Sequence, residues 1–325
     1  MIGRHSLGEM MNEPVTTAVS FHIFNRPDTT SRVFERIRAA RPRVLFVVAD
    51  GPREAHPADK ENCRATRRII DEVDWKCEVL RNYSEVNMGS YKRNSSGLSW
   101  LFDNVEEAIV LEDDCVPHPT FFRFCEELLA RYRNDNRIGA IGGNNFLKRP
   151  HHGHYSYIFS KFPLLWGWAG WRRTWKLIDR KMAYWPEFRK YGLRCCFPDR
   201  RLRGYWDNTI FQAIYEKKKK PAWDYEFMLT CFMQNMLTII PSVNLVTNIG
   251  FGDNGTNCLN PNDMAANIPC RPMEFPLVHP AYIIADCDAD TEMHFNRFDV
   301  QWNENKIVNI GRKMRLLIGL IGRVL

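Results

Sequence analysis

The feature that most constrains the fold is the regular alternation of two kinds of segment over residues 16–135. Runs rich in β-branched and apolar residues predict strands at 16–24, 43–51, 77–82 and 108–111. Apolar residues at helical spacing predict helices at 28–40, 62–73, 95–105 and 121–135. Such alternation is typical of an α/β fold, in which crossover helices flank a mostly parallel central sheet.

The second half of the chain is less regular and is expected to pack on the first. The chain has 325 residues, which allows one large domain or two ordinary ones. We predict a flexible tail at 1–13, one composite domain at 14–303 and a final helix at 304–325. The domain divides into a Rossmann-like half at 14–150 and a second half at 151–303.

An acidic triplet ends the fourth predicted strand. The apolar run at 108–111 leads directly into Glu112, Asp113 and Asp114. If strand geometry persists that far, Glu112 and Asp114 point to one face and Asp113 to the other. Two carboxylates on one face suit a hard divalent cation such as Mn²⁺ or Mg²⁺. The alternative interpretations are a solvated strand end and an acidic helix N-terminus.

Cationic side chains follow the other predicted strands. Arg26 and Arg53 come after the first two strands, and Lys92 and Arg93 come after the third. The carboxyl ends of parallel strands share one edge, where such sheets bind ligands. Arginine forks match phosphate geometry, so this edge could hold a metal-bound diphosphate. Asp50, at the tip of the second strand, could accept a hydrogen bond from a base.

Two common nucleotide motifs are missing from this edge. Neither the glycine fingerprint of dinucleotide folds nor the phosphate loop of nucleotide triphosphatases is present in the sequence. The net charge of +7 favours anionic ligands but is too weak to indicate a nucleic-acid partner.

Several motifs occur in a characteristic order. They are FNRP (24–27), ADG (49–51), NMGSYK (87–92), VLEDDCVPHPTFF (110–122), WGWAGW (166–171), WDYEF (223–227) and NLVTNIGFG (244–252). In this order the chain resembles bacterial nucleotide-diphospho-sugar transferases related to N-acetylglucosaminyltransferase I, which have the GT-A fold. The resemblance covers roughly residues 17–257.

The resemblance implies a GT-A fold with a nucleotide-sugar half at 14–150 and an acceptor half at 151–303. It implies an inverting, metal-dependent hexosyl- or N-acetylhexosaminyltransferase. The donor would be a nucleotide diphosphate sugar, typically a UDP-sugar. The acceptor would be a hydroxyl of a glycan or lipid-linked molecule in surface polysaccharide or glycoconjugate synthesis.

The resemblance also assigns roles to individual residues. Asp114 would hold the Mn²⁺ or Mg²⁺ that bridges the donor diphosphate, and Glu112 would face the ribose or sugar. The donor-binding residues would be Phe24, Arg26, Asp50, Lys92, Arg93, Glu112 and Asp113. The acceptor or sugar contacts would be Trp166, Gly167, Trp168, Trp171 and Glu226. For the tryptophans, the alternative is a tryptophan-rich core turn.

An inverting transfer needs a base that deprotonates the acceptor hydroxyl. Asp224 of WDYEF is our candidate, because Trp223 and Tyr225 beside it could partly desolvate the carboxylate. Glu226 and Asp207 are the next candidates. A structural helix-capping role is the alternative for Asp224.

The chain departs from the family pattern at one position. Asn257 stands where the family has a histidine after NIGFG, and asparagine is a poor metal ligand. Either Asp114 and the donor hold the cation alone, or Asp253 substitutes. The departure keeps open a non-catalytic sugar-nucleotide-binding module. A nucleotidyltransferase is the other alternative, although the segment after the first strand lacks the glycine-rich basic loop expected of one.

The remaining signals concern location. Ten cysteines without a CxxC pair predict free thiols in a reducing cytosol. The N-terminus lacks the apolar core of a signal peptide, and no run reaches the roughly 18 apolar residues of a membrane span. Residues 306–325 combine five basic residues with apolar ones at helical spacing. We expect a cytoplasmic protein, with this helix either folded back on the domain or lying on an anionic membrane surface at the inner face of the cell membrane.

One basic run stays ambiguous. EKKKKP (216–221) is expected to be a solvated helix end. Its alternative role is to attract a phosphorylated acceptor.

Overall fold

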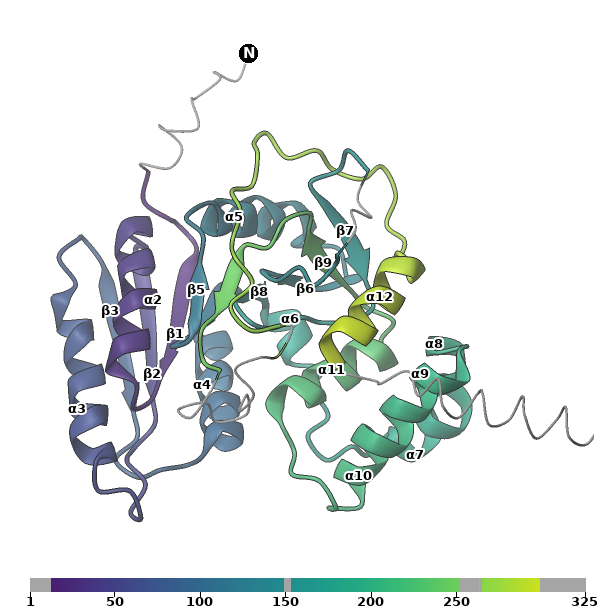
Figure 1. The fold of residues 1–325 in the computed structure, drawn as a ribbon, viewed down its shortest axis with the longest axis horizontal. Coiled ribbons are helices and arrows are strands. Elements are labelled where there is room, and N and C mark those ends of the chain that lie inside the picture. Colours follow the sequence, from purple (N-terminus) through teal and green to yellow (C-terminus); the bar gives the residue numbers. More distant parts are fainter. Residues whose placement is uncertain (1–12, 149–152, 252–262, 264, 299–325) are drawn as a thin grey trace, which may run out of the picture.

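An eight-stranded sheet forms the centre of the computed structural model, which describes residues 13–148, 153–251, 263 and 265–298 (Figure 1). Its strands are β1 (Ala18–Ile23), β2 (Val44–Ala49), β3 (Glu78–Tyr83), β4 (Glu107–Glu112), β6 (Ile138–Gly142), β7 (Tyr157–Ser160), β8 (Trp168–Trp171) and β9 (Leu237–Pro241). The order is β3-β2-β1-β4-β8-β6-β9-β7. Strands β8 and β7 run antiparallel to their neighbours, and the other pairs are parallel. The predicted α/β fold with a mostly parallel sheet is confirmed.

Helices cover both faces of the parallel half of the sheet. On one face, α2 (Pro27–Ala40) and α5 (Thr120–Tyr132) pack with Phe21 of β1. On the other face, α4 (Ser90–Asn104) packs with Phe46 of β2. Helix α3 (Asp59–Ile69) lies beside α2. Every residue of β1 is buried, as expected of a strand covered on both sides.

Two predicted boundaries differ from the structure at the site edge. Helix α4 begins at Ser90 rather than at 95, because Gly89 adopts a positive φ of 76° and sets the helix start there. The strand that carries the acidic triplet ends at Glu112, and residues 113–114 form a turn. The chain then enters a short strand, β5 (Cys115–Pro117), which pairs with β10 (Val246–Asn248). The expected alternation of strand faces therefore stops at Glu112.

The second half adds two helices and a separate helical unit to the sheet. Helix α11 (Trp223–Met233) packs in the same apolar cluster as α4, and α12 (Cys287–Phe298) contacts β7. We define the helical unit as residues 176–220. It contains α7 (Trp185–Glu187), α8 (Leu193–Cys196), α9 (Arg200–Gly204) and α10 (Gln212–Tyr215), with π-helical turns η2 (Phe188–Gly192) and η3 (Tyr205–Phe211). Figure 1 shows it at the lower right, away from β1–β3.

The helical unit has a core of its own. Trp185, Trp206 and Phe211 are each at most 1% exposed and pack together with apolar residues of α11. Burying one such side chain stabilises the fold by roughly 2–3 kcal/mol. This cluster holds the short helices in place.

Several predictions concern segments that the structure does not describe. They are the tail at 1–13 except for its last residue, the basic helix at 304–325, Asp253 and Asn257. In the described part of the chain, no helix combines the length and apolarity that a membrane crossing requires.

Candidate active site

A cavity of about 200 Å³ opens at the carboxyl ends of β1, β2 and β4. Residues from six of the seven motifs line it, all but WDYEF, together with neighbours that the sequence did not single out. The lining consists of His22, Ile23, Phe24, Arg26, Val48, Asp50, Arg53, Asn87, Gly89, Ser90, Arg93, Asn94, Glu112, Asp113, Asp114, Trp166, Asn248 and Gly250. The strand ends therefore converge on one cavity, as predicted.

Arg26 supplies the counter-charge for Asp113 and Asp114, which form the turn after β4 and are called the acidic turn below. Its guanidinium pairs with Asp113 and lies 3.1 Å from an Asp114 carboxylate oxygen. Asp113, 3% exposed, also accepts a hydrogen bond from the Phe24 amide at 3.0 Å. Burial opposes the charge of Arg26, but the two carboxylates outweigh it and raise its pKa. The end of β1 therefore compensates two of the three acids at the end of β4.

Glu112 is the acid that remains without compensation. Among the described residues, none donates a hydrogen bond to its carboxylate. Burial, followed by the charges of Asp114, Asp113 and Asp224, raises the pKa of Glu112 to about 8. At neutral pH the Glu112 carboxyl is therefore mostly protonated, while two further carboxylates, Asp113 and Asp114, share the one guanidinium of Arg26, so acids outnumber cations at this turn.

This excess of acids over cations fits a hard divalent cation. Asp114 lines the cavity with a largely buried carboxylate and can serve as an oxygen ligand. The described residues contain no group of three histidine, cysteine or acidic side chains that could hold a metal by itself. A cation here would therefore depend on donor phosphates and water for its other ligands, as Mg²⁺ commonly does.

Position 250 must be a glycine for the Asp114 side chain to lie where it does. A Cβ added to Gly250 would lie 2.1 Å from the Asp114 carboxylate oxygen. The neighbouring Ile249 amide donates to the Asp114 carbonyl at 2.9 Å. Only glycine at 250 leaves the carboxylate in its observed position. The sequence showed this residue within NIGFG but gave no reason for it.

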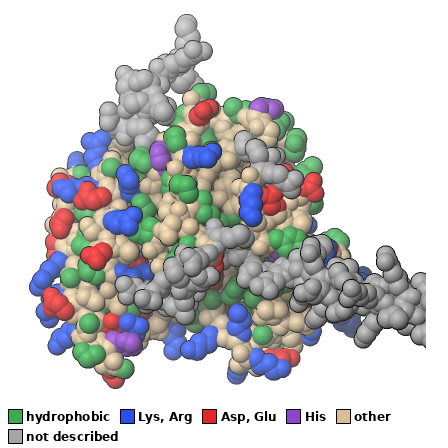
Figure 2. All heavy atoms as spheres, viewed as in Figure 1, with side chains coloured by type: hydrophobic (Ala, Val, Ile, Leu, Met, Phe, Trp, Pro, Cys, Tyr) green, Lys and Arg blue, Asp and Glu red, His purple; other side chains and the backbone are tan. Residues whose placement is uncertain are grey.

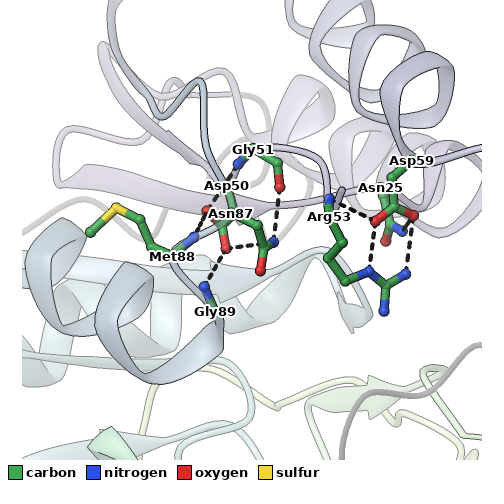
Figure 3. Close-up of polar contacts among 8 residues, drawn as sticks. All are labelled: Asn25, Asp50, Gly51, Arg53, Asp59, Asn87, Met88 and Gly89. Atoms are coloured by element: carbon green, nitrogen blue, oxygen red, sulfur yellow. Dashed lines mark hydrogen bonds and ion pairs between the residues drawn. The ribbon is translucent and has the colours of Figure 1, made fainter. Parts of the chain in front are cut away.

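Asp50 organises a loop rather than presenting free oxygens (Figure 3). One carboxylate oxygen accepts from the amides of Gly51 and Met88, at 2.9 and 2.8 Å. The other accepts from the Asn87 side chain and the Gly89 amide, at 3.1 and 3.0 Å. These four donors differ from the base N–H that was predicted as its partner. Asp50 fixes residues 87–89 at the wall of the cavity.

Arg53 forms a second braced group beside this loop (Figure 3). Its guanidinium donates to both Asp59 oxygens, at 2.6 and 3.0 Å, and Asn25 donates to the same carboxylate at 2.6 Å. The hydrogen bond from Arg53 holds the pKa of Asp59 at about 2. The guanidinium carbon lies 5.4 Å from the centre of the Phe24 ring. Sequence reasoning missed both partners, because Asn25 of FNRP was given no role and Asp59 lies in none of the motifs.

His22 is a further lining residue that the sequence gave no reason to choose. It is 5% exposed and hydrogen-bonds Asn94 at 2.8 Å and Ser20 at 3.1 Å. Burial lowers its pKa to about 4. At neutral pH it is therefore an uncharged hydrogen-bonding group behind the cavity.

Of the two cations predicted after β3, Arg93 lines the cavity and Lys92 does not. Arg93 lines the cavity but donates to the Ala49 carbonyl at 3.1 Å and to the Asn82 carbonyl and side chain at 2.5 and 2.8 Å. Lys92 is exposed and is not part of the cavity lining. Arg93 thus braces the ends of β2 and β3, since its fork is occupied by protein oxygens.

Only one tryptophan of WGWAGW reaches the cavity. Trp166 lines it, whereas Trp168 and Trp171 are 1% and 2% exposed on β8. Trp168 stacks on Trp223 with ring centroids 6.0 Å apart. Gly167, with φ of 64°, packs against Val246. The predicted sugar contacts at 168 and 171 lie in the core instead, because β8 is a central strand covered on both faces.

The predicted bases occupy three different settings. Asp224, at the second position of α11, accepts a hydrogen bond from the Tyr225 amide at 3.0 Å, and its charge acts on Glu112. Glu226 accepts from the Tyr91 hydroxyl at 2.5 Å and lies 3.3 Å from Arg180. Neither lines the cavity itself.

Asp207 lies outside this neighbourhood. It belongs to η3 of the helical unit and pairs with Arg189 at 2.6 Å. Asp224 is therefore the predicted base with an electrostatic link to the acidic turn.

Comparisons with known proteins yield partial structural similarity. No protein-family profile matches the chain, and no curated protein matches it in sequence. The mannosyltransferase PcManGT from Pyrobaculum calidifontis, in complex with GDP-Man and Mn²⁺, is 14% identical with a TM-score of 0.35, over 49% of this chain and 46% of its own length. An apo UDP-glucose pyrophosphorylase is 10% identical with a TM-score of 0.32, over 69% and 89%. Mouse xyloside xylosyltransferase 1 is 11% identical with a TM-score of 0.32, over 68% and 83%.

The similarity spans less than half of the mannosyltransferase. Function must therefore be argued from the geometry and charge of the site itself.

Proposed function

We propose that the protein is an inverting, divalent-metal-dependent glycosyltransferase. It transfers a sugar from a nucleotide diphosphate donor, a UDP-sugar in our proposal, to a hydroxyl of a glycan or lipid-linked acceptor. The observation that carries the proposal is the charge imbalance of the cavity. Glu112, Asp113 and Asp114 have one guanidinium beside them, that of Arg26, and burial together with the neighbouring carboxylates raises the pKa of Glu112. A cation that arrives with an anionic donor would complete this arrangement.

The walls of the cavity suit the two ends of such a donor. The Phe24 ring and the braced Arg53 offer a flat, cationic surface for a nucleobase. Gly89 and Ser90 line the cavity at the start of α4, whose first turn contains no acidic residue. A helix N-terminus favours phosphate. The diphosphate would therefore lie between α4 and Asp114.

Different groups would stabilise the leaving diphosphate and accept the proton of the acceptor hydroxyl. Bound Mn²⁺ or Mg²⁺ would neutralise the charge that gathers on the leaving diphosphate. Asp224 would accept the proton of the acceptor hydroxyl, and Arg26 would hold the acidic turn in place. A nucleotidyltransferase is the weaker alternative, since the chain passes from β1 into α2 without a glycine-rich loop.

A donor screen tests the proposal. Thermal unfolding is measured with a panel of UDP- and GDP-sugars and Mn²⁺, with and without EDTA. At a hundredfold excess over Kd, a bound donor should stabilise the protein by about 2.7 kcal/mol. Asp114→Asn should abolish the metal-dependent part, whereas Asp74→Asn, an exposed acid on another loop, should not. Stabilisation that persists in EDTA would rule out the metal.

The catalytic assignment needs a separate measurement. Asp224→Asn should lower the hydrolysis or transfer rate at least about a hundredfold, as expected for loss of a general base. Donor binding should stay unchanged in this variant. Normal turnover would remove Asp224 from the mechanism without affecting the donor site.

A further inference from the structure

A second groove lies in the helical unit, apart from the cavity described above. Its volume is about 480 Å³, within the range of small-molecule sites. It is lined by Trp185, Pro186, Arg189, Lys190, Asp207, Gln212 and Tyr215. None of these residues lines the donor cavity.

The chemistry of this groove is both aromatic and polar. Tyr215 is 44% exposed, and it lies beside the exposed cations Arg189 and Lys190. The polar groups are held in place. Arg189 pairs with Asp207 at 2.6 Å, and Gln212 accepts from the Trp185 indole at 2.9 Å. An aromatic face with fixed hydrogen-bonding groups suits a sugar ring, which has an apolar face and a rim of hydroxyls.

The charge around the groove narrows the ligand class. Residues 176–220 contain thirteen Lys and Arg but five Asp and Glu, a net charge of +8 compared with +7 for the whole chain. Four of these lysines, Lys217 to Lys220, follow α10 after Glu216, which pairs with Lys218 at 2.5 Å. Figure 2 shows basic side chains gathered at the lower edge of the molecule near α10. A concentrated positive charge attracts anionic ligands.

We infer that this groove binds an anionic glycan, such as a chain of uronic acid units. That this glycan is the acceptor of the reaction rests on the proposed glycosyltransferase function. That the groove binds the glycan does not depend on that function. An anionic membrane surface is a less suitable ligand for this unit than an anionic glycan. In the unit, the exposed large apolar side chains are three tyrosines and Leu177 rather than a continuous aliphatic face.

Polar contacts join the helical unit to α11 and, through α11, to α4, whose first turn lines the donor cavity. Arg180 of the helical unit lies 3.3 Å from Glu226 of α11, and Glu226 accepts from Tyr91 of α4. Asp224 lies two residues before Glu226. The helical unit is therefore anchored to α11, the helix that carries the proposed base Asp224.

Binding to defined oligomers tests the inference. Short polygalacturonate oligomers, neutral maltooligosaccharides of equal length and phosphatidylglycerol vesicles are each titrated into the full chain by calorimetry. The double variant Lys190→Gln and Tyr215→Ala should weaken polygalacturonate binding at least about tenfold, or 1.4 kcal/mol. The control pair Lys181→Gln and Tyr184→Ala removes an exposed cation and an exposed tyrosine of the same unit outside the groove, and should change binding less than about twofold.

The outcomes separate the possibilities. Equal weakening by both pairs would show diffuse charge attraction and overturn the site. Tighter binding of maltooligosaccharides, or binding only to phosphatidylglycerol vesicles, would overturn the anionic glycan. Selective weakening by the groove pair supports the site even if no sugar nucleotide binds, because donor binding is measured separately. Unchanged melting temperatures in both pairs confirm that the variants are folded.

Discussion

At the residue scale, the acidic turn is stabilised by a cation that the chain itself supplies. Burying one carboxylate is costly, and burying several next to each other is more so unless they are paired. Arg26 leaves β1 at the right place to meet Asp113 and Asp114, because β1 and β4 are parallel neighbours with their carboxyl ends together. The pairing with Arg26 therefore offsets the cost of burying Asp113 and Asp114 without a ligand. Glu112 has no such partner, and its pKa is raised.

Arg26→Gln should destabilise the fold, because it leaves the buried Asp113 charge without its partner. We expect a loss of roughly 3 kcal/mol in the free energy of unfolding, measured by urea denaturation. Arg38→Gln is the control, since Arg38 pairs with Asp74 at the surface, where solvent screens the pair, and its loss should be much smaller. Similar losses in the two variants would contradict a structural role for the Arg26 pair.

Gly250→Ala should displace the Asp114 carboxylate, because the added Cβ overlaps its oxygen. We expect metal-dependent donor binding to weaken at least about tenfold, or 1.4 kcal/mol, in calorimetric titrations. Gly204→Ala is the matched control, since a Cβ there meets nothing within 4 Å. Unchanged binding in Gly250→Ala would show that Asp114 does not need its observed position.

At the scale of elements, sequence patterns located the four parallel strands β1 to β4 well, but they missed the later strands and predicted side-chain directions poorly. The run at 108–111 predicted β4, because a strand buried on both faces must be apolar throughout. The turn at 113–114 was not predictable, since the strand that follows it pairs with β10, far along the chain. Likewise, WGWAGW shows clustered tryptophans but not that α11 packs over Trp168. Local pattern determines the element, and distant partners determine which way its side chains face.

The loop at 87–89 depends on one carboxylate from another element. Asp50→Ala removes the acceptor for the Met88 and Gly89 amides, so these amides should exchange hydrogen at least about tenfold faster in exchange experiments. Asn87→Ala keeps that acceptor and should leave both amides protected. Equal protection in all three proteins would show that Asp50 does not hold the loop.

At the scale of the whole molecule, two cores of different character share one chain. The sheet buries its apolar strands between helices, whereas the helical unit is built on tryptophan and phenylalanine with a strongly basic surface. The division predicted at 150 and 151 did not anticipate this unit, because its short helices and π-helical turns lack a regular apolar period. Its composition was visible in the sequence, but its separate core was not.

Stability as a function of pH should report on His22. Its pKa is about 4 in the folded protein and 6.5 in the unfolded chain, so the unfolded state binds more protons between these values. The contribution of His22 to stability should be full above pH 6.5 and should be lost as the pH drops toward 4, by roughly 3 kcal/mol. Unfolding measured from pH 7.5 to 4 should show a shallower decline in His22→Gln. His56→Gln, at an exposed position, should follow the wild type.

The uneven distribution of charge makes the molecule an electric dipole. With +8 in residues 176–220 and +7 in total, the rest of the chain carries about −1. A polyanion that approaches within a Debye length, about 8 Å at physiological salt, would exert a torque on the protein before contact. The helical unit would turn toward the polymer, and added salt would slow association more than it speeds dissociation.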